Sequence, residues 1–360
     1  MTLGPKLYID SAALKHNLQR IKELAPKQAV LAMIKANAYG HGLWNIVSAL
    51  DDVDALGVAR LQDALILRAR GMLQRIVVMN GFANEQELRA CAQQNLEAVI
   101  HTPQQLEILQ QGSLVQPINA WLKINTGMNR LGFPLNQAQD AYDFLQNSPN
   151  IKKPITLMTH FACADELANP MTTEQMQLFN EVSKHWQGAR SLANSAAILG
   201  WPDALGDWVR PGIILYGCSP FIGNVGTDHN LKPVMTLASS LIAIYDRFKG
   251  DKVGYGSMYE CEEAMRVGIV AIGYGDGYPR HAPSGTPVWI HHQRCPLVGR
   301  VSMDLIAVDL RACPNAAIGD KVVLWGPQLP VEYIARQAGS IGYELLCNMA
   351  RYHPYSQVTF

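Results

Sequence analysis

Short apolar segments alternate with helix-like segments from residue 29 to about residue 215. This alternation is typical of βαβ units, in which parallel strands are covered by the helices that connect them. The expected strands are residues 29–34, 55–58, 76–79, 98–100, 118–124, 155–160, 191–193 and 208–210. The expected helices include residues 61–70, 85–94, 104–111, 137–145 and 173–185. Eight strands are the number that closes a (β/α)8 barrel, so a TIM-type barrel is predicted, with an open doubly wound sheet as the alternative.

The pattern changes after about residue 230, where β-rich segments are separated by glycine, proline and aspartate turns. The expected strands there are residues 237–245, 266–272, 287–291, 305–310 and 321–325, and only residues 331–338 and 343–351 look helical. This change predicts a barrel over residues 1–230 and a mostly β domain over residues 231–360.

The composition excludes several classes of partner. Lysine plus arginine and aspartate plus glutamate both number 30, so net charge does not favour binding to nucleic acid or to an acidic membrane. No apolar run approaches the roughly 18 residues of a membrane helix, and no apolar signal segment opens the chain, so we expect a cytoplasmic protein. His291, His292 and Cys295 are near each other but have no second ligand cluster, so no metal site is expected.

Lys35 directly follows the six apolar residues of the first expected strand. There its amine would lie where a buried strand meets a loop crevice, and loss of water lowers the pKa of a lysine and makes it a nucleophile. Such an amine can form a Schiff base with an aldehyde, of which pyridoxal phosphate is the common cofactor. A lysine that merely extends into water is the alternative, and Lys35 taken alone favours it.

Further candidate site residues lie at the ends of the expected strands, which meet at one mouth in a barrel. They are Lys123 in the fifth strand, His160 at the end of the sixth, Asn194 and Ser195 after the seventh, and Arg210, Gly212 and Ile213 at the end of the eighth. The loops after the last two strands of such barrels commonly hold a phosphate. Ser195 offers a hydroxyl there, and Gly212 lets the backbone approach an anion closely.

Eight segments, in order along nearly the whole chain, resemble the alanine racemases. They are residues 32–42 (AMIKANAYGHG), 123–132 (KINTGMNRLG), 159–161 (THF), 193–197 (ANSAA), 209–217 (VRPGIILYG), 253–256 (VGYG), 272–278 (IGYGDGY) and 299–304 (GRVSMD). Members of this family depend on pyridoxal 5'-phosphate and have a barrel followed by a β domain. The resemblance therefore implies that cofactor here.

The resemblance also implies two catalytic bases. Lys35 would bind the cofactor and act on one face of the substrate, and Tyr255 would act on the opposite face. Racemisation needs both, because one group removes the α-proton and another returns it from the other side. A free phenol titrates near pKa ~10, so Tyr255 needs help, for which His160 and Arg210 are the candidates.

The remaining site residues are implied in the same way. Arg210 would face the pyridine nitrogen and leave it unprotonated, because a guanidinium only donates hydrogen bonds; this favours racemisation over decarboxylation or transamination. Arg130 would bind the substrate carboxylate, and Lys123 matches a lysine that many members carry as a carbamate. Met303 would line the substrate pocket. The implied cofactor-binding residues are Lys35, Tyr39, His160, Asn194, Ser195, Arg210, Gly212 and Ile213.

The resemblance further implies a homodimer in which Tyr255 and Met303 of one chain complete the site of the other. The predicted function is interconversion of L- and D-alanine, for peptidoglycan or for catabolism. A broad-specificity or serine racemase and a non-catalytic pyridoxal phosphate carrier are the alternatives. Family members usually carry an Arg-x-Pro stretch near the C-terminus. In this chain, Arg351-Tyr352-His353-Pro354 shifts the arginine by one residue, so cofactor contacts there are left unassigned.

Overall fold

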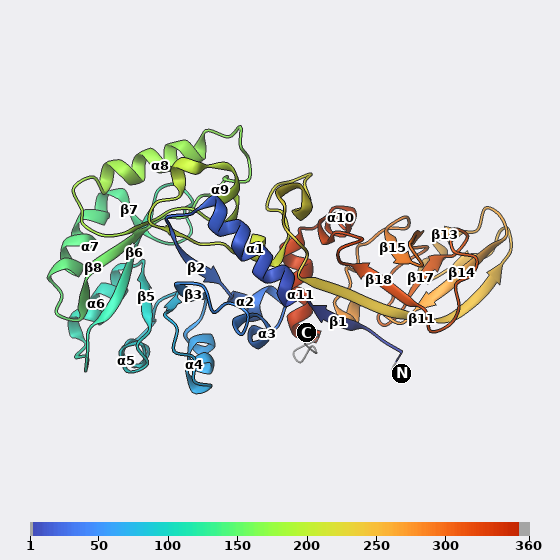
Figure 1. The fold of residues 1–360 in the computed structure, drawn as a ribbon, viewed down its shortest axis with the longest axis horizontal. Coiled ribbons are helices and arrows are strands. Elements are labelled where there is room, and N and C mark those ends of the chain that lie inside the picture. The colour runs from blue at the N-terminus through green and yellow to red at the C-terminus, as the bar shows by residue number, and fades with distance from the viewer. Residues whose placement is uncertain (1–2, 353–360) are drawn as a thin grey trace.

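The computed structural model describes residues 3–352 of the 360-residue chain. The side chains of Arg351-Tyr352-His353-Pro354 lie outside this description. Figure 1 shows two lobes: strands wrapped by helices, coloured blue to yellow, and a β-rich lobe coloured orange to red. Within residues 3–352, no helix has the length and apolarity needed to cross a bilayer.

The first lobe is built on eight parallel strands in the order β10-β2-β3-β4-β5-β6-β8-β9. Their bounds are β2 (Ala29–Met33), β3 (Ala55–Val58), β4 (Ile76–Val78), β5 (Glu97–Ile100), β6 (Ile118–Asn125), β8 (Ile151–Met158), β9 (Arg190–Ser191) and β10 (Trp208–Val209). The edges meet, because Asp207 N–H donates to the Arg190 carbonyl and Arg210 N–H donates to the Ala193 carbonyl. The predicted TIM-type barrel is therefore confirmed, and the open sheet is excluded.

Helices cover the outside of this barrel (Figure 1). They are α1 (Ser11–Leu24), α3 (Leu43–Val47), α4 (Leu61–Ala69), α5 (Glu85–Gln93), α6 (Pro103–Gln111), α7 (Leu135–Asn147), α8 (Met171–Val182) and α9 (Ser195–Gly200). Side-chain caps define several starts: Asp10 accepts from Ala13 N–H, and Asn84 accepts from Glu87 N–H. Every residue of β3, β4 and β5 is buried, as expected for strands between a helical layer and a filled barrel interior.

A buried carboxylate fills the amino-terminal end of the barrel. Glu97, which begins β5, is 3% exposed. It accepts hydrogen bonds from Arg75 Nε at 2.7 Å and from Trp121 Nε1 at 2.8 Å. The Arg75 guanidinium also lies over the Trp208 ring, 4.9 Å from its centre. These contacts join four strands at the end of the barrel opposite the mouth.

The second lobe is an antiparallel sheet in the order β16-β15-β18-β11-β14-β17. Its strands are β11 (Met235–Arg247), β14 (Met265–Val270), β15 (Pro287–Ile290), β16 (Gln293–Pro296), β17 (Ile306–Asp309) and β18 (Lys321–Trp325). A bridge between Leu297 and Val308 joins its two edges, so this sheet also closes. A small hairpin, β12 (Lys252–Val253) and β13 (Tyr259–Glu260), follows β11, and α10 (Val331–Gln337) follows β18.

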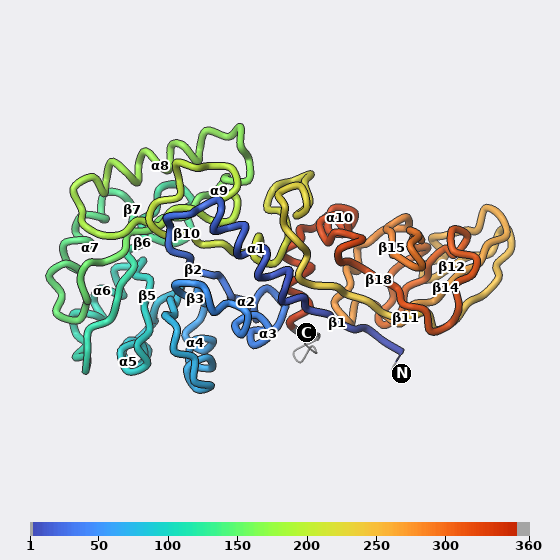
Figure 2. The backbone as a smooth tube through the Cα atoms, in the orientation of Figure 1, coloured from blue at the N-terminus to red at the C-terminus, as the bar shows by residue number. Residues whose placement is uncertain are grey.

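Both ends of the chain connect the two lobes, and Figure 2 traces this path. β1 (Lys6–Ile9) pairs antiparallel with β11, with Lys6 opposite Ala238. At the other end, α11 (Gly342–Tyr352) returns to pack on α2 (Lys35–Tyr39). This contact is close, because a Cβ at Gly40 would lie 1.8 Å from the Leu346 carbonyl oxygen.

Candidate active site

Lys35 lies two residues beyond β2, whereas the sequence predicts it directly after the last strand residue. The strand ends at Met33 because that is the last residue paired with β3, opposite Gly57. After Lys35 the backbone enters a left-handed turn, in which residues 36–39 all have φ between 52° and 55°. Asn37 stabilises this turn, because its Oδ1 accepts from Leu43 N–H at 2.7 Å.

Tyr39, Ser195 and Gly212 meet at one point of the barrel mouth. A Cβ at Gly212 would lie 2.4 Å from the Tyr39 hydroxyl oxygen and 3.7 Å from Ser195 Oγ. Gly212 N–H donates to Ser195 Oγ at 2.8 Å, whereas Ile213 N–H has no acceptor among the described residues. Asn194 caps α9 by accepting from Ala197 N–H. These groups form a concave donor set, here named the anion cradle (Tyr39, Ser195, Gly212 and Ile213), which suits a phosphate.

Arg210 is buried beside His160. Its Nη1 donates to Ser191 Oγ at 2.7 Å, and its Nη2 donates to the Thr159 carbonyl at 2.7 Å and to His160 Nδ1 at 3.2 Å. Arg210 Nε–H has no acceptor among residues 3–352. Burial lowers the pKa of Arg210 to about 10, so it stays charged at neutral pH. Burial and then Arg210 hold the pKa of His160 well below its usual range, so His160 is neutral with its proton on Nε2.

Positive charge dominates the mouth. Burial and then Arg210, Arg130 and Lys35 lower the pKa of Lys123 to about 8. The pKa of Lys35 is lowered by displaced water and then by Arg130. No described carboxylate forms an ion pair with Lys35, Lys123, Arg130 or Arg210. The mouth therefore suits anionic groups.

Tyr255 and Met303 both lie in the β domain. Tyr255 follows β12, which Figure 2 shows at the far end of the β lobe from α2. Tyr255 and Met303 are 70% and 55% exposed, and Met258, three residues after Tyr255, is 65% exposed. Within one chain the structure gathers the predicted barrel residues but does not bring Tyr255 or Met303 to them.

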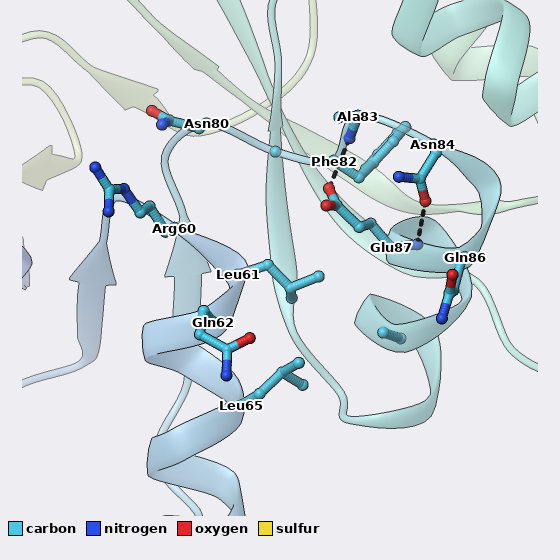
Figure 3. A pocket seen from close by; sticks show the side chains of 12 residues that line it. Arg60, Leu61, Gln62, Leu65, Asn80, Phe82, Ala83, Asn84, Gln86 and Glu87 are labelled. Carbon is cyan, nitrogen blue, oxygen red and sulfur yellow. Dashed lines mark hydrogen bonds between the residues drawn. The ribbon is translucent and has the colours of Figure 1, made fainter.

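A groove of about 530 Å³ lies at the carboxyl ends of β3 and β4. Figure 3 shows Arg60, Asn80 and Phe82 among the side chains that line it. None of the predicted site residues lines this groove. Within residues 3–352, no three His, Cys, Asp or Glu side chains are grouped so that they could hold a metal ion.

Two family profiles cover nearly the whole chain. The profile described as alanine racemase, N-terminal domain, matches residues 9–220, and that of the C-terminal domain matches residues 234–356. The chain belongs to the alanine racemase family. Curated alanine racemases from Shewanella woodyi and Coxiella burnetii are 49% identical over 345 residues and 52% identical over 348 residues. These alignments cover 96% and 95% of this chain, and 96% of each relative.

Solved alanine racemases have the same fold. The structure titled biosynthetic alanine racemase from Pseudomonas aeruginosa matches with a TM-score of 0.93 and 41% identity, over 97% of both chains. The alanine racemase from Acinetobacter baumannii matches with a TM-score of 0.92 and 41% identity, over 96% of this chain and 97% of its own.

The resemblance to alanine racemases does not identify Gln175, a helix residue whose side chain hydrogen bonds to residues at the barrel mouth. This α8 residue is 1% exposed and donates to Thr126 Oγ1 and to the His160 carbonyl, both at 3.1 Å. Its Oε1 accepts from Ala162 N–H. The only signal in the sequence is a glutamine at an inward position of an amphipathic helix, which is also common at surface positions.

Proposed function

We propose that this chain interconverts L- and D-alanine with pyridoxal phosphate as cofactor, residues 1–230 binding the cofactor and residues 231–360 supplying Tyr255. The observation that carries the proposal is the position of Lys35. Its amine, whose pKa is lowered, lies at a mouth that also contains three further cations, Lys123, Arg130 and Arg210, and the anion cradle. Such a mouth suits a phosphate and a substrate carboxylate bound together. Membership of the alanine racemase family supports the same reaction.

The residues present fit pyridoxal phosphate. Gly212 lets the Tyr39 hydroxyl lie against its backbone beside Ser195 Oγ, because any Cβ there would collide with that hydroxyl. This close approach groups the donors that a phosphate requires. Arg210 has an Nε–H without a described acceptor, as a donor to a ring nitrogen requires. When bound, the cofactor supplies an aldehyde that captures an amine and a ring that draws electrons from the substrate α-carbon.

Two bases on opposite faces of the substrate move the proton in this proposal. Lys35 serves one face, because its lowered pKa makes the neutral amine more available. Tyr255 serves the other face. Because Tyr255 and Met303 are exposed in the β domain, we propose a homodimer in which they complete the mouth of the other chain.

Arg210 and His160 control where protons reside. Arg210 only donates hydrogen bonds, and with a pKa of about 10 it keeps its own proton, so it would leave the ring nitrogen unprotonated. Reprotonation at the α-carbon is then favoured over decarboxylation or transamination. His160 accepts from Arg210 through Nδ1, which leaves its Nε2–H as a donor that can stabilise a Tyr255 phenolate.

Arg130 and Lys123 form the carboxylate side of the proposed site. Arg130 would bind the substrate carboxylate in a bidentate fashion. Lys123, with a pKa of about 8, has a neutral fraction that can attack carbon dioxide, and the resulting carbamate would pair with Arg130. A mass increase corresponding to one carbon dioxide in gently prepared protein would support this modification, and its absence would count against it.

Chiral analysis of products tests the proposed function. The cofactor-loaded protein is incubated separately with L-alanine, L-serine and other L-amino acids, and the D-products are quantified. We expect D-alanine to form far faster than any other D-amino acid. Comparable rates with many substrates would instead indicate a broad-specificity or serine racemase. Absence of any D-product, despite a bound cofactor, would indicate a carrier and refute the proposal.

A further inference from the structure

The turn that follows Lys35 has an unfavourable backbone conformation. Ala36, Asn37, Ala38 and Tyr39 are consecutive non-glycine residues with φ between 52° and 55°. L-amino acids avoid this region because Cβ approaches the following carbonyl oxygen, and such residues normally occur singly. A run of four therefore needs specific support, and Lys35 and Tyr39 lie at its two ends.

The His41 side chain supports this turn through hydrogen bonds to its backbone. Its Nδ1 lies 3.0 Å from the Ala38 carbonyl oxygen and 2.9 Å from the Tyr39 carbonyl oxygen. Both oxygens are acceptors, so Nδ1 carries the hydrogen and donates to this pair. The ring is fully buried, and its Nε2 has no partner among the described residues. Burial lowers the pKa of His41 to about 4, so the ring is a neutral donor at physiological pH.

Aromatic packing fixes the orientation of this donor. The His41 ring lies 4.5 Å from the ring of Tyr216, which in turn stacks on Tyr39 at 4.8 Å. The Tyr216 hydroxyl donates to the Met33 carbonyl at 2.9 Å, which anchors this group to the end of β2. His41 is thus held by the same ring that packs on Tyr39.

We propose that His41 is a positioning residue for the reaction proposed above: its Nδ1–H holds the left-handed turn and thereby keeps the Tyr39 hydroxyl in the anion cradle while Lys35 faces the mouth. This inference rests on the proposed function. Loss of the donor leaves the Tyr39 carbonyl without its hydrogen bond and the Ala38 carbonyl with backbone donors alone. The turn can then relax and displace the Tyr39 hydroxyl. The phosphate group of the cofactor is then bound less tightly.

Two substitutions distinguish the effect of the His41 Nδ1–H hydrogen bonds from the effect of ring packing. His41→Phe keeps a ring that can pack on Tyr216 but removes the N–H, whereas His41→Asn keeps an amide N–H close to the position of Nδ1. Cofactor affinity is measured by titrating pyridoxal phosphate and following the absorbance of its lysine-bound form. We expect His41→Phe to weaken binding roughly tenfold and His41→Asn to stay within about threefold of wild type. His229→Phe, at a histidine outside the predicted site whose ring lies tilted against that of Phe221, is the control and should bind as wild type does.

Several outcomes decide the inference. Wild-type affinity in His41→Phe would overturn it, as would equal weakening in both His41 variants when their melting temperatures match that of wild type. If His41→Phe does not fold, His41→Asn decides alone: near-wild-type affinity supports the donor role, and strong weakening overturns it. Binding and racemisation by the wild-type protein are measured first, since failure there refutes the proposed function and not the role of His41.

Discussion

Lys123 is a buried cation at the mouth that lowers the stability of the protein when no anion is bound. It is 7% exposed, and no described residue hydrogen bonds to its amine. Buried charges without partners are costly, and natural proteins retain them where a ligand or a modification compensates. Arg130 and Arg210 add to this cost by repulsion. The mouth is therefore less stable when empty than when it binds anions.

We expect Lys123→Met to stabilise the cofactor-free protein by about 1–3 kcal/mol at pH 7 in buffer free of carbon dioxide. The pKa of Lys123 in the folded protein is about 8, below its ordinary value of 10.5. Between pH 8 and pH 10.5 the amine is therefore protonated in the unfolded chain but neutral in the folded protein. The destabilisation by Lys123 is full below pH 8 and fades as the pH rises to 10.5. Urea denaturation from pH 7 to pH 10.5 should show that the difference in free energy of unfolding between variant and wild type becomes smaller.

Lys249→Met, at an exposed lysine of the β domain, serves as the control for this measurement. It should change the free energy of unfolding by less than about 0.5 kcal/mol at every pH. A Lys123→Met protein that is less stable than wild type at pH 7 would contradict the view of Lys123 as an uncompensated cation.

Sequence reasoning locates residues whose role follows from their place along a strand, and it misses those placed by tertiary contacts. Lys123 and Arg210 are predicted because strand ends meet at one mouth. The left-handed turn is not predictable, because Ala36 and Ala38 have no preference for positive φ. Gln175 is missed because nothing local relates a helix residue to His160.

The two ends of the barrel strands carry different features, the candidate site at one end and a stabilising network at the other. At the carboxyl ends of the strands, loops and turns carry the candidate site. At the amino ends, Glu97 on β5 joins Arg75 and Trp121 in a network that touches no candidate site residue. Stability and activity can therefore be perturbed separately.

Glu97→Leu should lower the free energy of unfolding by about 2–4 kcal/mol, because it leaves the Trp121 N–H buried without an acceptor and removes the partner of Arg75. Racemase activity per folded molecule should stay unchanged, since the network lies at the opposite end of the barrel from Lys35. Urea denaturation and an alanine racemisation assay measure the two effects. Glu107→Leu, at an exposed α6 position, is the control and should leave both nearly unchanged. Loss of activity in folded Glu97→Leu would contradict this division.

Elements with continuous apolar runs are the most predictable. β3 and β18 have the expected bounds, because all of β3 and every residue of β18 after Lys321 is apolar and buried. β16 is missed because its sequence, QRCP, begins with two exposed polar residues. β1 is missed because four residues carry little pattern, and its partner β11 lies far along the chain.

The complete assembly, as proposed, contains sites made from two chains, and this predicts complementation between inactive variants. Lys35→Ala and Tyr255→Phe proteins should each racemise alanine at least about 100-fold more slowly than wild type. After subunit exchange at equal amounts, half of the dimers are mixed, and each mixed dimer has one site with both bases. Activity should recover to about a quarter of the wild-type rate per subunit.

Mixing Lys35→Ala with a Lys35→Ala/Tyr255→Phe double variant is the control, since it yields no site with both bases. Differently tagged subunits report whether exchange has occurred. Exchange without recovery of activity would rule out the composite site, even if each chain binds the cofactor.

The packing of α11 on α2 also determines when the site can form during synthesis. The ribosome makes Lys35 well before Leu346, whose carbonyl lies against Gly40. Domains commonly fold as they emerge, N-terminal first. Here the turn after Lys35 gains the support of α11 only after that helix has been synthesised and has emerged. A nascent or truncated chain therefore carries Lys35 without the surroundings that hold it in place.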